Sequence, residues 1–322
     1  MDQFNVYKDM KARTNGEIYI GVVGPVRTGK STFIKRFMNL MVLPNIEDEN
    51  DRNRANDELP QSSSGKTIMT TEPKFVPNEA VSIKTEEGIE LNVRLIDCVG
   101  YMVEGATGHM EGEEERLVKT PWFDYEIPFT KAAAIGTKKV ITEHSTIGVV
   151  VTCDGSFGEI AAKQYEPAEE ETIKQLKTLK KPFVVLLNTI HPYSESTKQL
   201  AAEKEEKYQT KVLPMNLEQM KKEDIYEIIK SVLMEFPISS IGFYVPRWTE
   251  MLKKDHPLKM ELLQMARDVI TEKTTMRDIY EEQEKEYEYI TGQKLESVAM
   301  DSGEVVITVK VGDVYYYEFL SE

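Results

Sequence analysis

The fold is decided by GPVRTGKS at residues 24–31, a stretch that fits the spacing GxxxxGK(S/T). An apolar run at 18–23 precedes it, and a helix-like stretch at 32–42 follows it. In such a strand, loop and helix, glycines let successive backbone N–H groups turn inward on phosphates, and the helix presents its positive N-terminal end. The alternative is a glycine turn with a solvated lysine, which the flanking strand and helix disfavour. The stretch therefore predicts binding of a nucleoside triphosphate.

Strand-like and helix-like segments alternate through the first two thirds of the chain. The predicted elements are strands at 18–23, 75–83, 93–97, 146–153, 183–188 and 211–215, and helices at 32–42, 168–178, 194–208 and 217–236. Such alternation argues for an α/β fold with a mainly parallel sheet and helices on both of its faces. We expect this nucleotide domain to occupy residues 1–237. Two long connections, 44–71 and 100–145, interrupt it, and connections of this length are commonly functional or mobile.

The pattern changes after residue 237. The expected elements of the smaller α+β region, 238–322, are helices at 248–254, 258–271 and 275–289 and a β-hairpin of 305–309 with 314–319. The turn Val311-Gly312-Asp313 would join the two strands of that hairpin. A hairpin alone is marginally stable, so we expect it to pack on the preceding helices or on residues beyond Glu322.

The bulk composition excludes several classes of function. With 322 residues and 40% hydrophobic content, the chain can build two cores. Its 40 Lys and Arg against 55 Asp and Glu give a net charge of -15, which makes nucleic acid an unsuitable partner. Cys98 and Cys153 lie in strand-like runs and are expected to be reduced thiols. No secretory signal and no apolar run of about 18 residues occur, so we expect a cytoplasmic protein.

The residues that would handle phosphate come from two places in the sequence. Lys30 would reach the β and γ phosphates, and Ser31 would ligate Mg²⁺. Asp97 and Gly100 form a DxxG element after the strand at 93–97, where Asp97 can hold Mg²⁺ through water and Gly100 can offer its N–H to the γ phosphate. Arg27 could add positive charge near the bridging oxygens, or it could point to solvent.

The first long connection ends in two threonines, Thr70 and Thr71. Switch regions of GTPase-like proteins supply a threonine at this position to Mg²⁺ and to the attacking water, and either residue could serve. The alternative is a β-branched pair that opens a strand. No glutamine follows Gly100 to position water, because Tyr101 and Met102 stand there. We therefore expect slow hydrolysis, or hydrolysis that depends on assembly.

Base recognition departs from the GTPase pattern. GTPases carry NKxD after the equivalent strand, whereas this chain has Asn188-Thr189-Ile190-His191. The asparagine is kept, but the carboxylate that pairs with guanine is missing. Because a buried paired acceptor gives strong discrimination between bases, we expect ATP rather than GTP.

Four motifs together resemble the stage IV sporulation protein A family of endospore-forming bacteria: GPVRTGKS at 24–31, KTIMTTEPKFVP at 66–77, LIDCVGY at 95–101 and LLNTIHP at 186–192. The resemblance covers the whole chain. It implies a P-loop NTPase of the GTPase-like, translation-factor-related class that has changed from GTP to ATP. It also implies ATP hydrolysis that drives self-assembly into the basement layer of the spore coat, in the mother-cell cytoplasm on the forespore outer membrane surface.

The resemblance also implies roles for individual residues, with ATP and Mg²⁺ as cofactors. The catalytic candidates are Thr70, Thr71, Lys30 and Asp97. The metal candidates are Ser31, Thr70, Thr71 and Asp97. The nucleotide-binding candidates are Gly24, Arg27, Thr28, Gly29, Lys30, Ser31, Thr32, Gly100 and Asn188.

The resemblance names partners as well. The first is the protein itself, as a homopolymer. Other spore coat proteins and a small amphipathic membrane peptide would bind a further C-terminal region, which we expect a chain ending at Glu322 to lack.

Two other functions fit parts of the sequence. The first is a regulatory GTPase-type switch, which predicts tight GTP binding. The second is a structural coat or filament protein with a relict nucleotide site, which the intact set of five phosphate-site residues disfavours.

Overall fold

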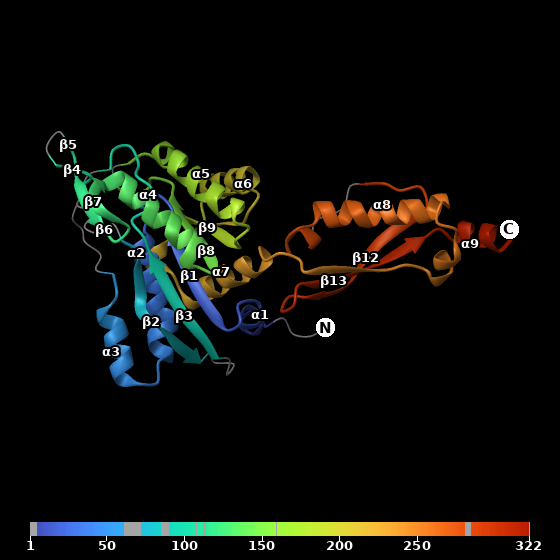
Figure 1. The fold of residues 1–322 in the computed structure, drawn as a ribbon, viewed down its shortest axis with the longest axis horizontal. Helices are drawn as coiled ribbons and strands as arrows, with labels where there is room; N and C mark the ends of the chain where they lie inside the picture. Colours follow the sequence, from blue (N-terminus) through green and yellow to red (C-terminus); the bar gives the residue numbers. More distant parts are fainter. Residues whose placement is uncertain are drawn as a thin grey trace. The chain divides into compact units, whose positions relative to one another are not determined.

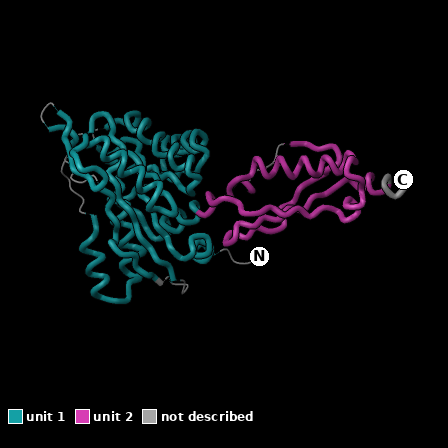
Figure 2. Tube along the Cα trace, in the orientation of Figure 1, with its two compact units in different colours: residues 1–232 teal, residues 233–322 magenta. Residues whose placement is uncertain are grey.

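The computed structural model describes residues 5–60, 72–84, 90–106, 108–111, 114–158, 160–280 and 285–321. Figure 1 shows the order of helices and strands along the chain. The chain divides into two compact units, Met1–Val232 and Leu233–Glu322, which have different colours in Figure 2. Residues 1–232 are the first unit, and residues 233–322 are the second unit.

A six-stranded sheet forms the centre of the first unit, with the order β10-β9-β8-β1-β3-β2. Neighbouring strands pair in parallel, except β2, which runs antiparallel to β3 at the edge. The prediction of an α/β protein with a mainly parallel sheet is thus confirmed. The strands are β1 Glu17–Val23, β2 Lys74–Lys84, β3 Glu90–Asp97, β8 Ile147–Cys153, β9 Phe183–Asn188 and β10 Val212–Met215.

The middle of this sheet is covered on both faces. Every residue of β8 and of β9 is buried, as is typical of parallel strands between two layers of helices. On one face, Val150 packs in a common core with Ile173 and Leu176 of α5. Its neighbours Val149 and Val151 point to the opposite face and are also buried. The carboxyl ends of the parallel strands therefore meet at one edge of a rigid sheet.

Helices connect these strands, and three of them differ from their predicted bounds by more than one residue. They are α1 Val6–Arg13, α2 Lys30–Phe37, α3 Glu49–Asp57, α4 Phe129–Lys139, α5 Ala162–Thr178, α6 Glu195–Tyr208 and α7 Lys222–Met234. The helix predicted at 32–42 begins earlier, at Lys30, and its last residues form a π-helical turn, Met38–Val42. The helix predicted at 168–178 begins at Ala162 and contains Pro167. The helix predicted at 217–236 is divided into a 3-10 turn, Leu217–Gln219, and the shorter α7.

Both long connections contain secondary structure. The first carries α3, whose N-cap Asp48 accepts hydrogen bonds from the amides of Asn50 and Asp51. The second carries α4 and two antiparallel pairs of short strands. These pairs are β4 Met110–Glu111 with β5 Glu114–Glu115, and β6 Leu117–Thr120 with β7 Phe123–Pro128.

The second unit has a three-stranded sheet with the order β11-β13-β12. The strands are β11 Ser240–Tyr244, β12 Ile290–Ala299 and β13 Glu304–Val311. The hairpin predicted from 305–309 and 314–319 is wrong in its second strand, because β13 pairs antiparallel with β12. The turn between them ends at Gly303, which has a φ of +75° and donates its N–H to the Ala299 carbonyl.

The segment predicted as that second strand, 314–319, lies within helix α9, Asp313–Ser321. Two other predicted elements of the second unit are also corrected. The segment predicted as a helix at 275–289 contains only a short 3-10 turn, Asp278–Tyr280, among its described residues. Its later backbone amides, at Glu288 and Tyr289, donate instead to the carboxylate of Glu261. A 3-10 turn, Arg247–Met251, stands where the helix at 248–254 was expected.

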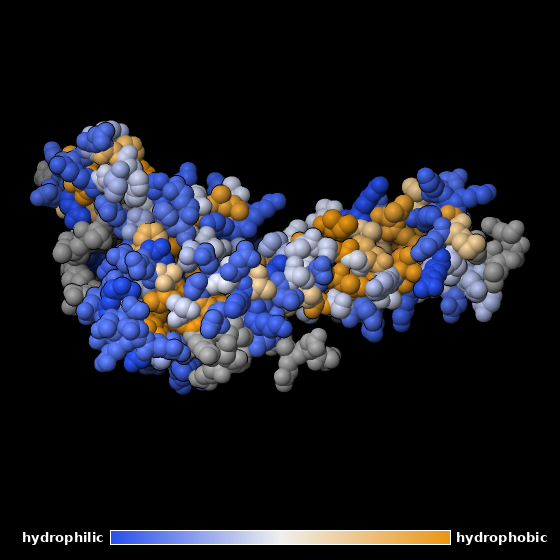
Figure 3. All heavy atoms as spheres, turned by 60° about the horizontal axis from the view of Figure 1, so that its bottom comes forward, coloured by the Kyte–Doolittle hydropathy of each residue, from blue (hydrophilic) through white to orange (hydrophobic). Residues whose placement is uncertain are grey.

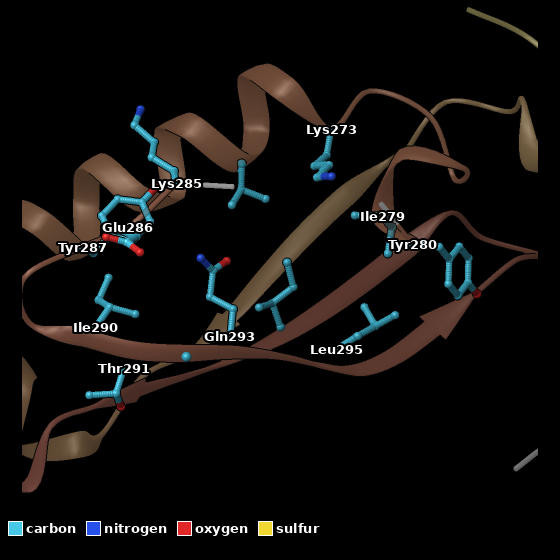
Figure 4. Close-up of a pocket in the computed structure, with 13 residues that line it drawn as sticks. Lys273, Ile279, Tyr280, Lys285, Glu286, Tyr287, Ile290, Thr291, Gln293 and Leu295 are labelled. Carbon is cyan, nitrogen blue, oxygen red and sulfur yellow. The ribbon is translucent and has the colours of Figure 1, made fainter. Parts of the chain in front are cut away.

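Helix α8, Pro257–Glu272, lies along one face of this small sheet (Figure 1). Its residues Leu262 and Val269 are buried, and so is Ile307 of β13. A hollow of about 680 Å³ remains beside the helix, lined in part by Val269, Leu295 and Ile307. Figure 4 shows Gln293 pointing into this hollow from β12. A single helix thus covers only part of the sheet face.

Candidate functional site

The loop at 24–31 joins β1 to α2 in a conformation that depends on glycine. Gly24 has a φ of +126°, and an added Cβ would lie 2.4 Å from the Val151 carbonyl oxygen. Gly29 has a φ of +101° and is the N-cap of α2, where no side chain caps the helix. The first N–H groups of α2 are therefore left for another acceptor, and an anion is the acceptor that a helix N-terminus favours.

Lys30 turns its ammonium group back over this loop. Its side chain is buried, and Nζ donates to the carbonyl oxygens of Gly24, at 3.3 Å, and Pro25, at 2.5 Å. Burial lowers the pKa of Lys30, an effect that nearby anionic groups including Asp97 oppose. A buried ammonium group is stabilised when an anionic group pairs with it, and a phosphate group would be such a partner for Lys30.

Ser31 and Asp97 meet at the carboxyl ends of β1 and β3. The Ser31 hydroxyl donates to Asp97 Oδ2 at 3.0 Å. Asp97 Oδ1 is buried and has no hydrogen-bond partner among the described residues. Burial raises the pKa of this carboxyl, while Lys30 and Ser31 act in the opposite direction. A buried carboxylate oxygen without a partner, beside a hydroxyl, fits the oxygen ligands that Mg²⁺ prefers.

Gly100 closes the site from the β3 side. An added Cβ would lie 2.1 Å from the Gly24 carbonyl oxygen and 2.6 Å from Lys30 Nζ, and the φ of Gly100 is +93°. Immediately after it, Tyr101 accepts a hydrogen bond from the Val26 amide at 3.0 Å. An isolated parallel bridge between Pro25 and Tyr101 therefore joins the loop to the segment that follows β3. No local pattern in the sequence predicts this Val26–Tyr101 pairing.

Asn188 supports the loop from the end of β9. Its Nδ2 donates to the Thr28 carbonyl at 3.0 Å, and its Oδ1 accepts from the Leu217 amide at 3.2 Å. An added Cβ on Gly29 would lie 2.5 Å from that Nδ2. Asn188, predicted to bind nucleotide, thus directly contacts the loop and the segment after β10. Leu217 is a participant that the sequence did not reveal.

The residues after Asn188 form a turn that hydrogen bonds connect to the segment after β8. The buried Thr189 donates its hydroxyl to Asp154 Oδ2 at 2.6 Å and accepts from the His191 amide at 3.1 Å. The Ile190 amide donates to the Ser156 hydroxyl at 3.1 Å. By position in the sequence, Thr189 and His191 align with the Lys and Asp of the GTPase pattern. Both oxygens of Asp154 are engaged, since Oδ1 also accepts from the Ser156 amide.

The remaining predicted site residues have different surroundings. Thr28 is buried, with its hydroxyl bonded to the Pro25 carbonyl at 3.0 Å, so it shapes the loop. Arg27 is exposed and has a φ of +62°, and Thr32 is half-buried in the first turn of α2. Thr70 and Thr71 lie outside the described residues. The structure thus brings together the glycines, Lys30, Ser31, Asp97 and Asn188.

Fold and site together define a mixed α/β protein whose glycine-rich loop joins a parallel strand to a helix beside a buried carboxylate. Comparison with known families matches residues 1–237 to "Stage IV sporulation protein A, ATPase domain" and residues 238–322 to "Stage IV sporulation protein A, middle domain". The chain belongs to the stage IV sporulation protein A family. Within the described residues, no helix has the length and apolar character needed to cross a bilayer.

Three curated proteins called stage IV sporulation protein A are similar to the chain. The protein of Clostridioides difficile is 48% identical over 99% of the chain and 65% of its own length. Those of Bacillus anthracis and Bacillus subtilis are 46% and 45% identical over 100% of the chain and 66% of their own lengths. The chain thus spans slightly less than two thirds of these relatives.

Proposed function

We propose that this chain is a P-loop NTPase of the GTPase-like, translation-factor-related class, which binds ATP with Mg²⁺ and hydrolyses it slowly. The observation that carries the proposal is the buried Asp97 Oδ1, which lacks a partner among the described residues next to the Ser31 hydroxyl. A buried polar atom of this kind costs free energy, about 1–3 kcal/mol, unless a ligand satisfies it. Mg²⁺ accompanying the nucleotide would be such a ligand.

The residues of the site would divide the work of binding. Lys30 would exchange its bonds to the Gly24 and Pro25 carbonyls for phosphate oxygens, which carry full negative charge. Ser31 and Asp97 would hold Mg²⁺, and the first N–H groups of α2 would bind the phosphates. Bound Mg²⁺ neutralises charge that develops on the phosphate oxygens during transfer. Thr70 and Thr71 stay predictions as the residues that sense the γ phosphate and promote attack by water.

The turn after β9 supports ATP over GTP. At the position where GTPases place an aspartate, this chain has His191, which carries no carboxylate. The nearby carboxylate of Asp154 accepts hydrogen bonds from Ser156 and Thr189. A guanine base would therefore lack the paired acceptor on which its selection depends.

The wider role is proposed from the family. Hydrolysis would change segments ordered by the γ phosphate and so change the competence of the protein to polymerise. The polymer would form the basement layer of the spore coat, on the forespore surface in the mother-cell cytoplasm. Other coat proteins and a small amphipathic membrane peptide would be its partners through the family's C-terminal region.

Nucleotide binding to two matched variants tests the proposal. Lys30→Ala should abolish ATP binding, whereas Lys35→Ala removes an exposed lysine from the same helix and should leave it unchanged. Turnover measured against protein concentration should rise faster than linearly if assembly promotes catalysis. Equal ATP affinity in both variants would refute the site, and displacement of labelled ATP by lower concentrations of GTP would favour a regulatory GTPase instead.

A further inference from the structure

Arg27 has a backbone conformation that its place in the fold does not explain. Among the described residues, four other than glycine have a positive φ: Asn15 at 54°, Arg27 at 62°, Lys180 at 52° and Gln209 at 44°. Three of them follow the ends of helices α1, α5 and α6 within two residues, and helices commonly end on a residue in the left-handed region. Arg27 follows no helix, because it lies between β1 and α2. Its conformation therefore requires a separate explanation.

Arginine is an unfavourable residue for this conformation. The Cβ of an L residue disfavours the left-handed region, which glycine adopts readily. The same loop has glycine at its two other positions of positive φ, Gly24 and Gly29. An exposed arginine alone is ordinary, because hydrophilic side chains cover most of the surface of the first unit on the side that Figure 3 shows. Strained residues other than glycine are found mainly at functional sites, so the side chain of Arg27 is the feature to explain.

The residues on either side hold Arg27 in this conformation. Val26 is buried, and its amide donates to the Tyr101 carbonyl at 3.0 Å. Thr28 is buried as well, and its carbonyl accepts from Nδ2 of Asn188 at 3.0 Å. Arg27 itself is exposed. Two fixed and buried neighbours thus keep the side chain between them at the surface of the loop, and they maintain a strain that a mobile loop would relieve.

The two cations of the loop differ in what they can add to catalysis. The ammonium group of Lys30 is buried and bonded to two loop carbonyls, so its place is set before a nucleotide binds. The guanidinium of Arg27 is on an exposed side chain, stays ionised, and has planar donors that suit phosphate oxygens. A long exposed side chain can move onto charge that appears only during the reaction, and interactions made only in the transition state are the ones that raise kcat.

We propose that Arg27 is a catalytic residue that stabilises the γ phosphoryl group in the transition state of ATP hydrolysis. This inference rests on the proposed ATPase function. In that reaction a water oxygen forms a bond to the γ phosphorus, the bond from this phosphorus to the bridging oxygen breaks, and ADP leaves with the electron pair. The water loses one proton to the solvent, whereas Arg27 keeps its protons and only donates hydrogen bonds. No glutamine follows Gly100 to orient the water, so the arginine of the loop carries a larger share of the catalysis.

A role in packing alone is the alternative. Burial raises the pKa of Tyr165 in α5, and the charge of Arg27 opposes that rise, so Arg27 acts on a buried group beside the loop. A packing role would make the Tm of the ligand-free protein and its affinity for ADP depend on Arg27. A catalytic role makes neither depend on it, since ADP lacks the phosphoryl group that is transferred. The two roles therefore predict different results from the same variant.

Arg27→Gly tests the proposal without added strain, because glycine can keep the same φ. Lys180→Gly is the matched control, since it removes another exposed basic residue of positive φ outside the loop. For each protein we would measure the ligand-free Tm, the affinity for ADP, and the affinity for ADP with Mg²⁺ and aluminium fluoride, which mimics the transferred phosphoryl group. Both variants should keep the Tm and the ADP affinity of the parent protein. The aluminium fluoride complex should bind roughly a hundredfold more weakly to Arg27→Gly alone, with kcat lower by a similar factor and KM little changed.

Each outcome of this experiment bears on the proposal. Equal binding of the aluminium fluoride complex by Arg27→Gly and Lys180→Gly would overturn it. A fall in Tm, or a loss of ADP affinity as large as the loss for the complex, would also overturn it, because Arg27 would then serve packing or ground-state binding. A parent protein that binds neither ADP nor ATP would instead refute the ATPase proposal and this inference with it, a result that cannot be confused with a loss confined to Arg27→Gly.

Discussion

Replacement of Asn188 by alanine should loosen the loop at 24–31 from a distance. The Asn188 side chain makes two buried hydrogen bonds, to the Thr28 carbonyl and from the Leu217 amide. Alanine can make neither of them. Both backbone groups would then be buried without their partner, and the loop would lose its attachment to the end of β9.

The structure sets the size of this effect. Leaving a buried donor or acceptor unsatisfied costs about 1–3 kcal/mol, so two such groups should lower the free energy of unfolding by roughly 2–4 kcal/mol after partial hydration. In a unit of this size that corresponds to roughly 4–16 °C in Tm. If ordering the loosened loop costs about 1.4 kcal/mol, ATP binding weakens about tenfold.

The assay is calorimetry of the ligand-free protein, followed by titration with ATP. Asn216→Ala is the matched control, because Asn216 is half-buried and caps a short 3-10 turn through one bond to the Glu218 amide. That change should cost about 1 kcal/mol and leave ATP affinity nearly unchanged. If Asn188→Ala melts like Asn216→Ala and binds ATP like the parent protein, the side chain does not hold the loop and our reasoning fails.

Three further predictions concern the same site. Gly100→Ala adds a Cβ that would lie 2.1 Å from the Gly24 carbonyl oxygen, in a backbone with a φ of +93°. The change should abolish ATP binding and lower the free energy of unfolding by about 2–4 kcal/mol. An unchanged ATP affinity, measured by titration, would contradict this. Because burial raises the pKa of Asp97, its ionised carboxylate destabilises the ligand-free fold as pH rises above 3.8. Asp97→Asn should therefore raise the Tm of the ligand-free protein and remove the stabilisation by Mg-ATP. If Mg-ATP raised the Tm of the variant and of the parent protein equally, the metal role of Asp97 would be excluded. Burial raises the pKa of Cys98 to about 11, so roughly one Cys98 thiol in a thousand is ionised at pH 8. Labelling of Cys98 by a thiol-reactive disulfide should therefore require unfolding. Fast labelling of the folded protein would show instead that the thiol is accessible.

The first unit was largely predictable, because its signals are local. Strand-like runs such as 146–153 carry nearly continuous apolar residues, and buried parallel strands require that pattern. The loop at 24–31 was recognisable by its glycine spacing. Asp97 and Gly100 could be assigned since they follow a strand, and parallel strands bring their carboxyl ends to one edge.

The second unit was less predictable because its strands lack the continuous apolar runs of the first unit, as the mostly exposed or half-buried residues of β12 show. The aromatic residues in 313–321 favour a strand by propensity, yet this segment is the helix α9. In it Tyr315 packs against Tyr289, with ring centroids 4.8 Å apart. Such a contact between residues far apart in sequence outweighs a propensity of about 1 kcal/mol at most, and no local pattern reveals it.

The link between Leu217 and Asn188 was hidden for the same reason. It joins an amide and a side chain that lie 29 positions apart along the chain. Backbone amides carry no distinguishing sequence, so only the folded chain shows which of them a side chain selects.

The isolated bridge between Pro25 and Tyr101 also limits where the chain can bend. The segment after β3 cannot pivot at Gly100 without breaking the hydrogen bond from the Val26 amide to the Tyr101 carbonyl. Val103 and Ala106 are held as well, because both are buried in one core with Val26. Any swing of the second long connection in response to the nucleotide would therefore have its hinge beyond Ala106, while the backbone at Gly100 stays joined to the loop at 24–31.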